Sequence, residues 1–229
     1  MKRVKDVIRP EAGEIFDIEL EEDFLEANRK IAQKNSGLLK KFNVKSIDIM
    51  GSVGAGKTSL IELLVQRLKE RYRIVAIGGD VTTTIDAERI ARHGVDVIQI
   101  NTGKECHLDA NLVHKALKKI DLGKIDLLLV ENVGNLICPA DFPVGCSSRI
   151  VVISVTEGEH MVVKHPLIFS EADLVVINKK DLAEIISVNI SNIKMDISEL
   201  NPNLQVVTTS CKTGDGVDEV IKSLKLELM

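Results

Sequence analysis

The amino-acid sequence predicts an α/β fold, with a doubly wound, mostly parallel sheet and a helix in front of it. From residue 45 onward, short apolar runs alternate with amphipathic segments, as in chains that build parallel sheets through crossover helices. Most of these runs are continuous Val, Ile and Leu, which is typical of strands covered on both faces. A glycine-rich phosphate-binding pattern follows the first run, so we expect a P-loop nucleoside triphosphatase.

The expected elements follow one another in a regular order. Residues 1–20 mix charged and isolated apolar residues and are expected to form an irregular arm. Residues 21–42 are expected to form a helix, because apolar side chains recur there at helical spacing. That stripe consists of Phe24, Ala27, Ile31, Leu38 and Leu39. Strands are expected near residues 45–50, 73–78, 95–100, 126–131, 149–155, 173–178 and 204–209. Helices are expected near residues 57–71, 84–93, 105–120, 158–170, 182–200 and 215–227.

Composition excludes several classes of function. The net charge is −4 and only 3% of the residues are aromatic, which argues against nucleic-acid binding, since phosphate backbones attract basic surfaces and unpaired bases stack on aromatic rings. No apolar run is long enough to span a membrane and no secretory signal is visible, so no membrane contact is expected. The cysteines are Cys106, Cys138, Cys146 and Cys211. Four cysteines in a chain with no visible secretory signal indicate a cytoplasmic protein whose thiols are free.

The phosphate-binding pattern G-x-x-x-x-G-K-[ST] begins at residue 51. Glycines let the backbone curl so that its N–H groups face phosphate oxygens, and the following helix N-terminus adds its dipole. Lys57 is expected to reach the β- and γ-phosphates, and the Thr58 hydroxyl to ligate Mg²⁺. A chance glycine turn before a helix is the alternative, and the preceding strand argues against it. The expected nucleotide contacts here are Gly51, Ser52, Val53, Gly54, Ala55, Gly56, Lys57, Thr58 and Ser59.

Two later loops indicate guanine as the base. Asn178-Lys179-Lys180-Asp181 follows a buried strand and matches the N-K-x-D pattern of guanine-specific proteins. The Asp181 carboxylate can accept two hydrogen bonds from guanine, whereas adenine offers no such pair of donors. Asn178 is expected to hold the loop, and the Lys179 stem to cover the base. A charged turn between strand and helix is the alternative.

The second base loop is expected at Ser210-Cys211-Lys212, after the last strand. It is close to the S-A-K sequence of GTPases. Together the two loops favour GTP and GDP over adenine nucleotides.

Two further strand ends are expected to meet the triphosphate. Glu131 stands where ordinary GTPases carry the Asp of D-x-x-G, and Gly134 would sense the γ-phosphate through its N–H. Glu in place of Asp leaves open how directly this carboxylate touches the metal. Asp80 follows another strand and is expected to ligate Mg²⁺ or to align the attacking water, the alternative being a helix cap near Ile85. Lys57, Asp80 and Glu131 are therefore the expected catalytic residues.

Three residues form a candidate site for Ni²⁺ or Zn²⁺. Cys106 and His107 are adjacent, and Cys138 lies shortly after Gly134. Borderline-soft metals take thiolate and imidazole ligands. The chain has no C-x-x-C motif, so two small buried thiols and a surface histidine are the alternative; Cys146 could also join Cys138. A metal held by three protein ligands has a fourth position, open to water or to a second copy of the chain.

Four segments together resemble the HypB family of nickel-insertion GTPases. They are Glu131 to Pro139 (ENVGNLICP), Glu105-Cys106-His107, Gly79-Asp80 and Lys164-His165-Pro166, and the resemblance covers roughly residues 20–229. It implies a SIMIBI-type G domain, GTP- and metal-linked homodimerisation, and a Ni²⁺ or Zn²⁺ site at Cys106, His107 and Cys138 near the dimer interface. It further implies a HypA-type nickel metallochaperone as partner and a hydrogenase large-subunit precursor as client.

The expected function is GTP hydrolysis coupled to nickel delivery during [NiFe]-hydrogenase maturation. The expected domains are an N-terminal arm and helix, residues 1–43, and a GTPase domain with the metal site, residues 44–229. No arginine finger is evident, so turnover is expected to be slow, with Lys164 of a second copy as the candidate contact in trans. The rivals are a urease-type nickel GTPase, a nucleotide-stabilised nickel or zinc store, and a kinase, in which N-K-x-D would have no role.

Overall fold

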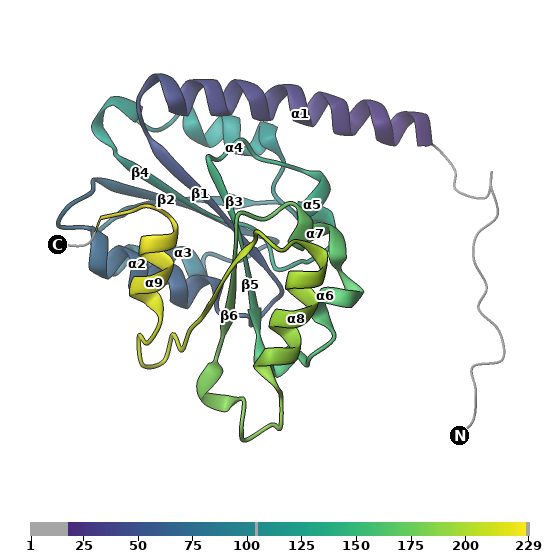
Figure 1. Ribbon diagram of the computed structural model, residues 1–229. Helices are drawn as coiled ribbons and strands as arrows, with labels where there is room; N and C mark the ends of the chain where they lie inside the picture. Colours follow the sequence, from purple (N-terminus) through teal and green to yellow (C-terminus); the bar gives the residue numbers. More distant parts are fainter. Residues whose placement is uncertain (1–17, 104, 228–229) are drawn as a thin grey trace.

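The computed structural model describes residues 18–103 and 105–227, with a seven-stranded sheet at its centre (Figure 1). The strand order is β3-β2-β4-β1-β5-β6-β7, and every pairing is parallel. The strands are β1 Lys45–Gly51, β2 Ile74–Asp80, β3 Asp96–Asn101, β4 Leu127–Glu131, β5 Ser148–Ser154, β6 Leu174–Asn178 and β7 Gln205–Thr208. The predicted α/β fold is confirmed, and the sheet is wholly parallel rather than mostly so. All carboxyl ends therefore lie along one edge of the sheet.

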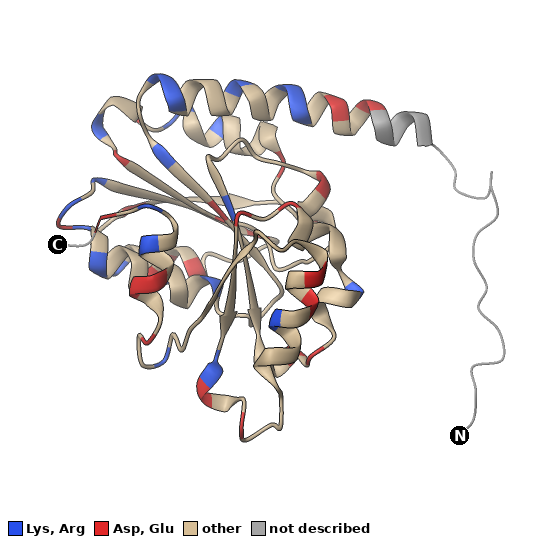
Figure 2. Cartoon of the chain, in the orientation of Figure 1, with Lys and Arg blue, Asp and Glu red and all other residues tan. Residues whose placement is uncertain are grey.

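Helices cover both faces of the sheet. One face carries α2, α3 and α9, and the other carries α1 and α4 over one half and α5 to α8 over the other half (Figure 1). The helices are α1 Ile18–Lys41, α2 Lys57–Leu68, α3 Ile85–Ala91, α4 Ala110–Leu117, α5 Cys138–Asp141, α6 Met161–Lys164, α7 Pro166–Ser170, α8 Ile190–Leu200 and α9 Val217–Ser223. Charged residues lie mostly on the helices and loops (Figure 2).

The helices predicted after residue 45 are all shorter in the structure, and three of them are divided or begin late for a local reason. The helix predicted at residues 158–170 is split into α6 and α7 next to Pro166, which has no N–H to continue the helix. The helix predicted at 182–200 begins only at Ile190, where the Asn189 side chain caps it by accepting a hydrogen bond from Ser191 N. The helix predicted at 105–120 begins at Ala110 and is capped by Asp109 in the same way.

The sheet divides the apolar core into a continuous half and a divided half. Under α2 and α9, buried side chains from six strands form one cluster. On the opposite face, one cluster lies under α4 and α1 and another under α5 to α8. Strand β1 runs between these two clusters, and Ser46 and Asp48 are fully buried on it. This line of buried polar residues is called the polar seam below.

Helix α1 packs along α4 with a face that the sequence analysis placed wrongly. Phe24 is 57% exposed and Ala27 is exposed, so of the predicted stripe only Leu39 is fully buried. The buried positions are Asn28, Ala32, Asn35 and Leu39. Two asparagines are inside because they have polar partners: Asn35 Nδ2 donates to the Ala110 and Val144 carbonyls at 2.8 and 3.0 Å. Of the arm predicted for residues 1–20, residues 1–17 lie outside the described residues. Residues 18–20 belong to α1.

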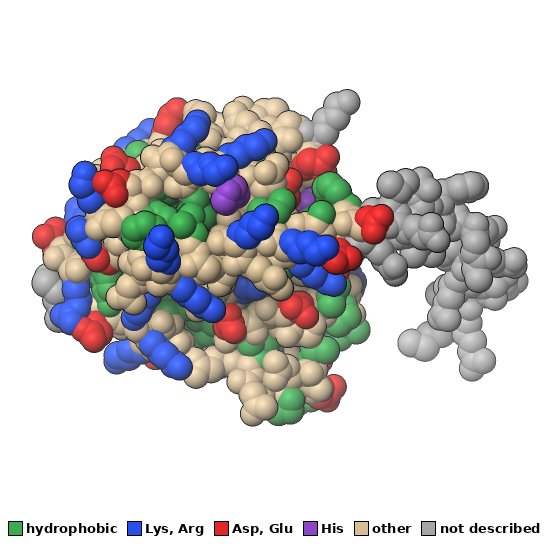
Figure 3. Space-filling view, turned by 90° about the horizontal axis from the view of Figure 1, so that it is seen from above, with side chains coloured by type: hydrophobic (Ala, Val, Ile, Leu, Met, Phe, Trp, Pro, Cys, Tyr) green, Lys and Arg blue, Asp and Glu red, His purple; other side chains and the backbone are tan. Residues whose placement is uncertain are grey.

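None of the described helices is long and apolar enough to cross a bilayer. On the face that carries α1, basic and acidic side chains are interspersed (Figure 3).

The buried amide of Asn35 predicts a measurable effect on stability. Asn35→Ala leaves two buried carbonyls without their donor, so the free energy of unfolding should fall by about 1–3 kcal/mol. Urea denaturation followed by circular dichroism measures it. Lys34→Ala, at the exposed neighbouring position, is the control and should change stability by less than about 0.5 kcal/mol. Equal stability of the two variants would show that α1 is not anchored through Asn35.

Candidate nucleotide and metal site

A cavity of about 650 Å³ opens at the carboxyl edge of the sheet. It is bounded by the loops that follow β1, β2, β4, β6 and β7, which the parallel arrangement brings to the same edge. Most of the predicted nucleotide and catalytic residues line it: Val53, Gly54, Gly56, Lys57, Thr58, Ser59, Asp80, Glu131, Gly134, Asn178, Lys179, Asp181, Cys211 and Lys212. Gly51, Ser52, Ala55 and Ser210 are not in its lining; Gly51 is the last residue of β1, and the other three lie in loops that contribute to the lining.

The phosphate loop has the curled backbone that its glycines predict. Gly56 has φ +103°, and a Cβ there would lie 2.2 Å from the Asn178 amide nitrogen, so only glycine fits. The Lys57 ammonium donates to the carbonyls of Gly51 and Ser52 at 3.1 and 3.0 Å. Burial lowers the pKa of Lys57, and nearby carboxylates oppose that shift. The ammonium thus sits inside the loop, close to where the phosphates are expected.

Thr58 and Glu131 are joined directly across the cavity wall. The Thr58 hydroxyl donates to Glu131 Oε1 at 2.6 Å. Glu131 Oε2 is buried and has no hydrogen-bond partner among the described residues. Burial raises the pKa of Glu131 to about 7, although Thr58 and Lys57 pull it down. A buried acidic oxygen beside a threonine hydroxyl fits a hard cation such as Mg²⁺.

Asp80 lines the same cavity and holds a turn rather than a helix. Its Oδ1 accepts hydrogen bonds from the backbone N–H groups of Thr82 and Thr83 at 2.9 and 2.6 Å. The N-cap position of α3 is Thr84, so the helix-cap alternative for Asp80 is wrong. Although partial desolvation opposes the shift, these hydrogen bonds lower the pKa of Asp80 and keep it ionised toward the cavity.

Asn178 holds the phosphate loop and both base loops together. Its Nδ2 donates to the Ala55 carbonyl at 2.9 Å, and its Oδ1 accepts from Thr209 Oγ1 and from Cys211 N at 3.1 and 3.0 Å. The Ser210 hydroxyl lowers the pKa of the exposed Asp181, which is therefore ionised at neutral pH. A single buried amide thus sets the distance between the phosphate end and the base end of the cavity.

Other polar residues of the site carried no clear signal in the sequence. Ser52 Oγ donates to Glu157 Oε1 at 2.5 Å, and burial raises the pKa of Glu157. Asp86 and Arg89 line the cavity, where Arg89 pairs with Glu62 at 2.6 Å and with Asp86 at 3.3 Å. No role was predicted for Asp86, Arg89 or Glu157. Glu157 lies 105 residues after its partner Ser52 in the phosphate loop, so no local pattern links the two.

The three residues predicted to bind metal come together at one point. The ligand atoms of Cys106, His107 and Cys138 all lie within 4.8 Å of one another. The Cys106 and Cys138 sulfurs are 3.1 Å apart, and Cys106 Sγ is 4.0 Å from His107 Nδ1. Cys138 is the first residue of α5, which the sequence analysis did not predict. Cys146 lies in the loop before β5 and does not belong to this group.

The cluster contains soft donors at different depths. Cys106 is exposed, Cys138 is half-buried and His107 is buried beneath Phe142, whose ring centroid is 4.1 Å away. Burial lowers the pKa of His107 and raises the pKa of the Cys138 thiol. A neutral imidazole with two thiols suits Ni²⁺ or Zn²⁺ better than Mg²⁺.

Two hydrogen-bonded routes lead from the phosphate loop to this cluster. In the first, Asn135 N donates to the same Gly51 carbonyl that accepts from Lys57, at 3.1 Å. The Asn135 side chain then contacts both ligand segments, through Cys106 O at 3.4 Å and Ile137 N at 2.8 Å.

The second route starts at Thr58 of the phosphate loop, whose hydroxyl donates to Glu131. The next residue, Asn132, accepts a hydrogen bond from Leu108 N through its Oδ1 at 3.0 Å. Leu108 directly follows His107. Each route therefore ends within one residue of a predicted metal ligand.

Comparison with known proteins agrees with this geometry. Residues 45–208 match the nucleotide-binding domain of the CobW/HypB/UreG family. The probable hydrogenase maturation factor HypB of Methanocaldococcus jannaschii is 50% identical over 208 residues, which are 91% of this chain and 94% of that protein. The chain belongs to the HypB family. The HypB of Escherichia coli, named a hydrogenase maturation factor, is 35% identical over 92% of this chain and 72% of its own length.

Solved HypB structures share the fold. HypB from Archaeoglobus fulgidus superposes with a TM-score of 0.82 at 44% identity and covers 87% of this chain and 98% of its own. HypB from Helicobacter pylori, solved in complex with nickel, has the same TM-score at 32% identity, with 87% and 94% covered. The signal recognition particle receptor FtsY of Elizabethkingia anophelis, at 14% identity and TM-score 0.55, shares the fold alone. The chain is thus a P-loop GTPase of the HypB branch and a hydrogenase maturation factor.

Removal of the Asn178 amide should loosen the cavity. Asn178→Ala leaves the buried Ala55 carbonyl and the Cys211 N–H without partners, so GDP should bind more weakly by about 1–3 kcal/mol, roughly 5- to 150-fold. Titration calorimetry with GDP measures the change. Asn189→Ala removes a helix cap away from the cavity, so it should cost stability but not GDP affinity. Wild-type GDP affinity in Asn178→Ala would contradict the role given to this amide.

Proposed function

We propose that the chain couples hydrolysis of Mg·GTP to the binding and release of nickel during [NiFe]-hydrogenase maturation. The observation that carries this proposal is the Gly51 carbonyl, which accepts hydrogen bonds from Lys57 in the phosphate loop and from Asn135 beside the metal cluster. Nickel is cargo, held by the group of Cys106, His107 and Cys138. The nucleotide sets how well that group is assembled.

The nucleotide site supports guanine and hydrolysis. Asp181 presents an ionised carboxylate at the base end, with Lys179 and Lys212 beside it in the lining. At the phosphate end, Lys57 would bind β- and γ-oxygens, while Thr58 and Asp80 would hold Mg²⁺. The ion would supply positive charge to the phosphates. Glu131 would keep the Thr58 hydroxyl oriented, and the Gly134 N–H would report the γ-phosphate.

Asp181 should set the choice of base. Asp181→Asn loses the charged acceptor for the guanine donors, so GTP binding should weaken by roughly 2–5 kcal/mol while xanthosine triphosphate gains affinity. Displacement of a fluorescent GDP analogue from the protein by each nucleotide measures both changes in affinity. The matched control is Asp215→Asn, an exposed carboxylate that pairs with Lys180 outside the cavity. Unchanged GTP binding in Asp181→Asn would place base recognition elsewhere.

Nickel binding is proposed from the donor set and from the family. The HypB structure from Helicobacter pylori is a complex with nickel, and this chain brings two thiols and an imidazole to one point. The three protein ligands leave room for a fourth, which a second copy of the chain can supply. We therefore include a GTP- and metal-linked homodimer in the proposal, in which the exposed Lys164 at the end of α6 contacts the partner's nucleotide.

The same proposal assigns partners and domains. A HypA-type metallochaperone would supply nickel, and a hydrogenase large-subunit precursor would receive it. Residues 1–43 would form an N-terminal unit, and residues 44–229 the GTPase domain. Helix α1 packs on α4, and Phe24 of α1 contacts Phe142 above His107, with ring centroids 5.8 Å apart, so the N-terminal unit would sense the metal cluster.

Nickel affinity should depend on the nucleotide state. Cys138 lies four residues beyond Gly134, so movement of the γ-phosphate loop should displace its thiolate relative to Cys106 and His107. The affinities in the GDP and GTP-analogue states should differ by about 1–3 kcal/mol, roughly 5- to 150-fold. Calorimetric titration of Ni²⁺ into each state measures the difference, and sedimentation of the same samples measures dimerisation.

The control for this coupling is a pair of cysteine variants. Cys138→Ala should lose most nickel affinity and all of its dependence on nucleotide, with GTP binding nearly unchanged. Cys146→Ala, a thiol outside the cluster, should behave like wild type in both titrations. Equal nickel affinity of the wild-type chain in the two nucleotide states would leave a metal site without a switch.

A further inference from the structure

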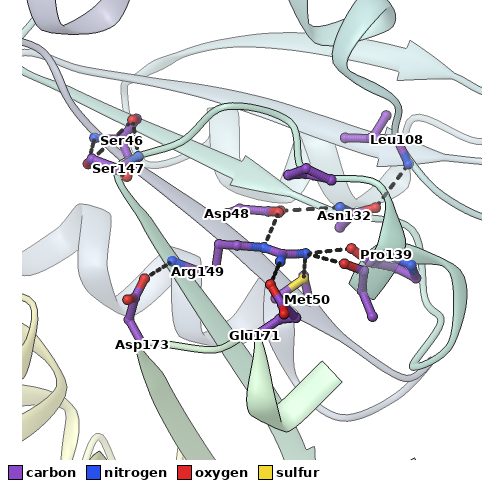
Figure 4. Close-up of polar contacts among 12 residues, drawn as sticks. Ser46, Asp48, Met50, Leu108, Asn132, Pro139, Ser147, Arg149, Glu171 and Asp173 are labelled. Atoms are coloured by element: carbon purple, nitrogen blue, oxygen red, sulfur yellow. Dashed lines mark hydrogen bonds and ion pairs between the residues drawn. The ribbon is translucent and has the colours of Figure 1, made fainter. Parts of the chain in front are cut away.

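A buried ion pair joins Asp48 of the polar seam to Arg149 of the neighbouring strand β5 (Figure 4). Asp48 of β1 and Arg149 of β5 are neighbours in the parallel register, and their side chains are 0% and 14% exposed. Asp48 Oδ2 and Arg149 Nε lie 3.9 Å apart, and neither atom has a hydrogen-bond partner among the described residues. Asp48 also contacts the segment that follows His107, through Asn132, and Arg149 also contacts the segment that follows Cys138.

The carboxylate points toward the His107 segment. Asp48 Oδ1 accepts from Asn132 Nδ2 at 3.2 Å, and Asn132 Oδ1 accepts in turn from Leu108 N at 3.0 Å (Figure 4). Asn132 is itself completely buried, so its amide has no water to turn toward. Its orientation is therefore set by Asp48 on one side and by the backbone that follows His107 on the other.

The guanidinium points toward the Cys138 segment. Arg149 Nη2 donates to the carbonyls of Pro139 and Ala140 at 2.5 and 3.4 Å, and Pro139 directly follows Cys138 (Figure 4). Helix α5 has only four residues, too few to hold its own position by helical hydrogen bonds. The hydrogen bonds from Arg149 thus hold the short helix that begins with Cys138 in place. Nη2 also donates to Met50 Sδ at 3.4 Å, and the contact from Nη1 to the half-exposed Glu171 is longer at 3.6 Å.

A structural role alone does not account for this arrangement. Burying two charges is costly, and well-packed apolar residues often fill such a position at equal or better stability. Apolar clusters lie on both sides of the seam, so apolar packing is available. Burial raises the pKa of Asp48 to about 6 against the pull of Arg149, which still leaves an ionised carboxylate at neutral pH. What an apolar pair could not do is accept a hydrogen bond from Asn132 and donate one to the Pro139 carbonyl, the contacts that reach the two segments.

We propose that Asp48 and Arg149 are positioning residues for nickel. Arg149 supports the place of Cys138, and Asp48, acting through Asn132, supports the place of His107, so that the ion pair stabilises the assembled arrangement of the ligands. The inference rests on the proposed nickel site at Cys106, His107 and Cys138, and it adds two residues that contact neither nickel nor nucleotide. Because Asp48 lies on β1 three residues before Gly51, the same strand carries the phosphate loop and the support of the metal site.

The test variant is Arg149→Lys, which keeps a positive charge beside Asp48 but cannot also reach the two α5 carbonyls. Loss of such outer-shell support typically weakens metal binding 10- to 100-fold, and we expect a loss of that size in Ni²⁺ affinity. The thiolate-to-nickel charge-transfer absorption should change as well, while GDP affinity stays at the wild-type value. Glu171→Gln, the matched control, alters only the outer contact of Arg149 and should leave nickel affinity and spectrum unchanged.

A double-mutant cycle separates positioning from general destabilisation. If Arg149 acts through Cys138, Arg149→Lys should have little further effect on residual Ni²⁺ affinity in a Cys138→Ala background. Asp48→Asn, which keeps the size and the acceptor for Asn132 but removes the charge, is the second variant should Arg149→Lys fold poorly, and it should also weaken nickel binding at unchanged GDP affinity.

The outcomes distinguish this inference from the function on which it rests. Wild-type nickel affinity and spectrum in Arg149→Lys, or parallel losses of nickel and GDP affinity, would overturn the positioning role. Equal nickel affinity of the wild type and Cys138→Ala would instead overturn the nickel site itself.

Discussion

Strands β1 and β4 are adjacent and parallel, with Ile49 paired to Glu131, and the chemistry of the site depends on this pairing. It brings the end of β1, where the phosphate loop starts, beside the end of β4, where Glu131 begins the next loop. The Thr58 hydroxyl can then reach Glu131 at 2.6 Å, and the Gly51 carbonyl can accept from Asn135. A shift of this register by one residue would turn Glu131 to the opposite face of the sheet and break the first contact.

Cationic neighbours explain why acidic residues are tolerated inside the sheet. Buried carboxylates are costly, and burial raises the pKa values of Asp48 and Glu131 to about 6 and about 7. Each has a cationic neighbour: Arg149 for Asp48 and Lys57 for Glu131. One carboxylate therefore faces the nucleotide and the other faces the support of the metal cluster. They lie on adjacent strands, with Asp48 paired to Val130, the residue before Glu131.

Local sequence was sufficient for the fold and for most of the cavity, and insufficient for the contacts that link its parts. The phosphate loop, the strand ends and the base loops are set by turn chemistry within a few residues, and the structure puts Lys57, Asp80, Glu131 and Asp181 in one lining. The stripe on α1 was wrong because Asn28 and Asn35 are buried against carbonyls, which no hydrophobic pattern records. Arg149 went unnoticed because its partners, Asp48 and Pro139, are identified only by the packing of β1, β5 and α5.

Hydrogen-bond energies set a scale for communication between the two ends of the site. The Gly51 carbonyl has two donors, Lys57 and Asn135, and a lysine that turns to bind phosphate leaves Asn135 as the remaining one. A single hydrogen bond contributes about 0.5–1.5 kcal/mol net. The second route, through Glu131 and Asn132 to Leu108, can contribute a free energy of similar size. Two such routes supply about 1–3 kcal/mol, which is the usual range of coupling between sites. The proposed switch therefore needs no large domain movement: a change in two hydrogen bonds, transmitted to the segments that carry the three proposed ligands, is sufficient to tighten or loosen them.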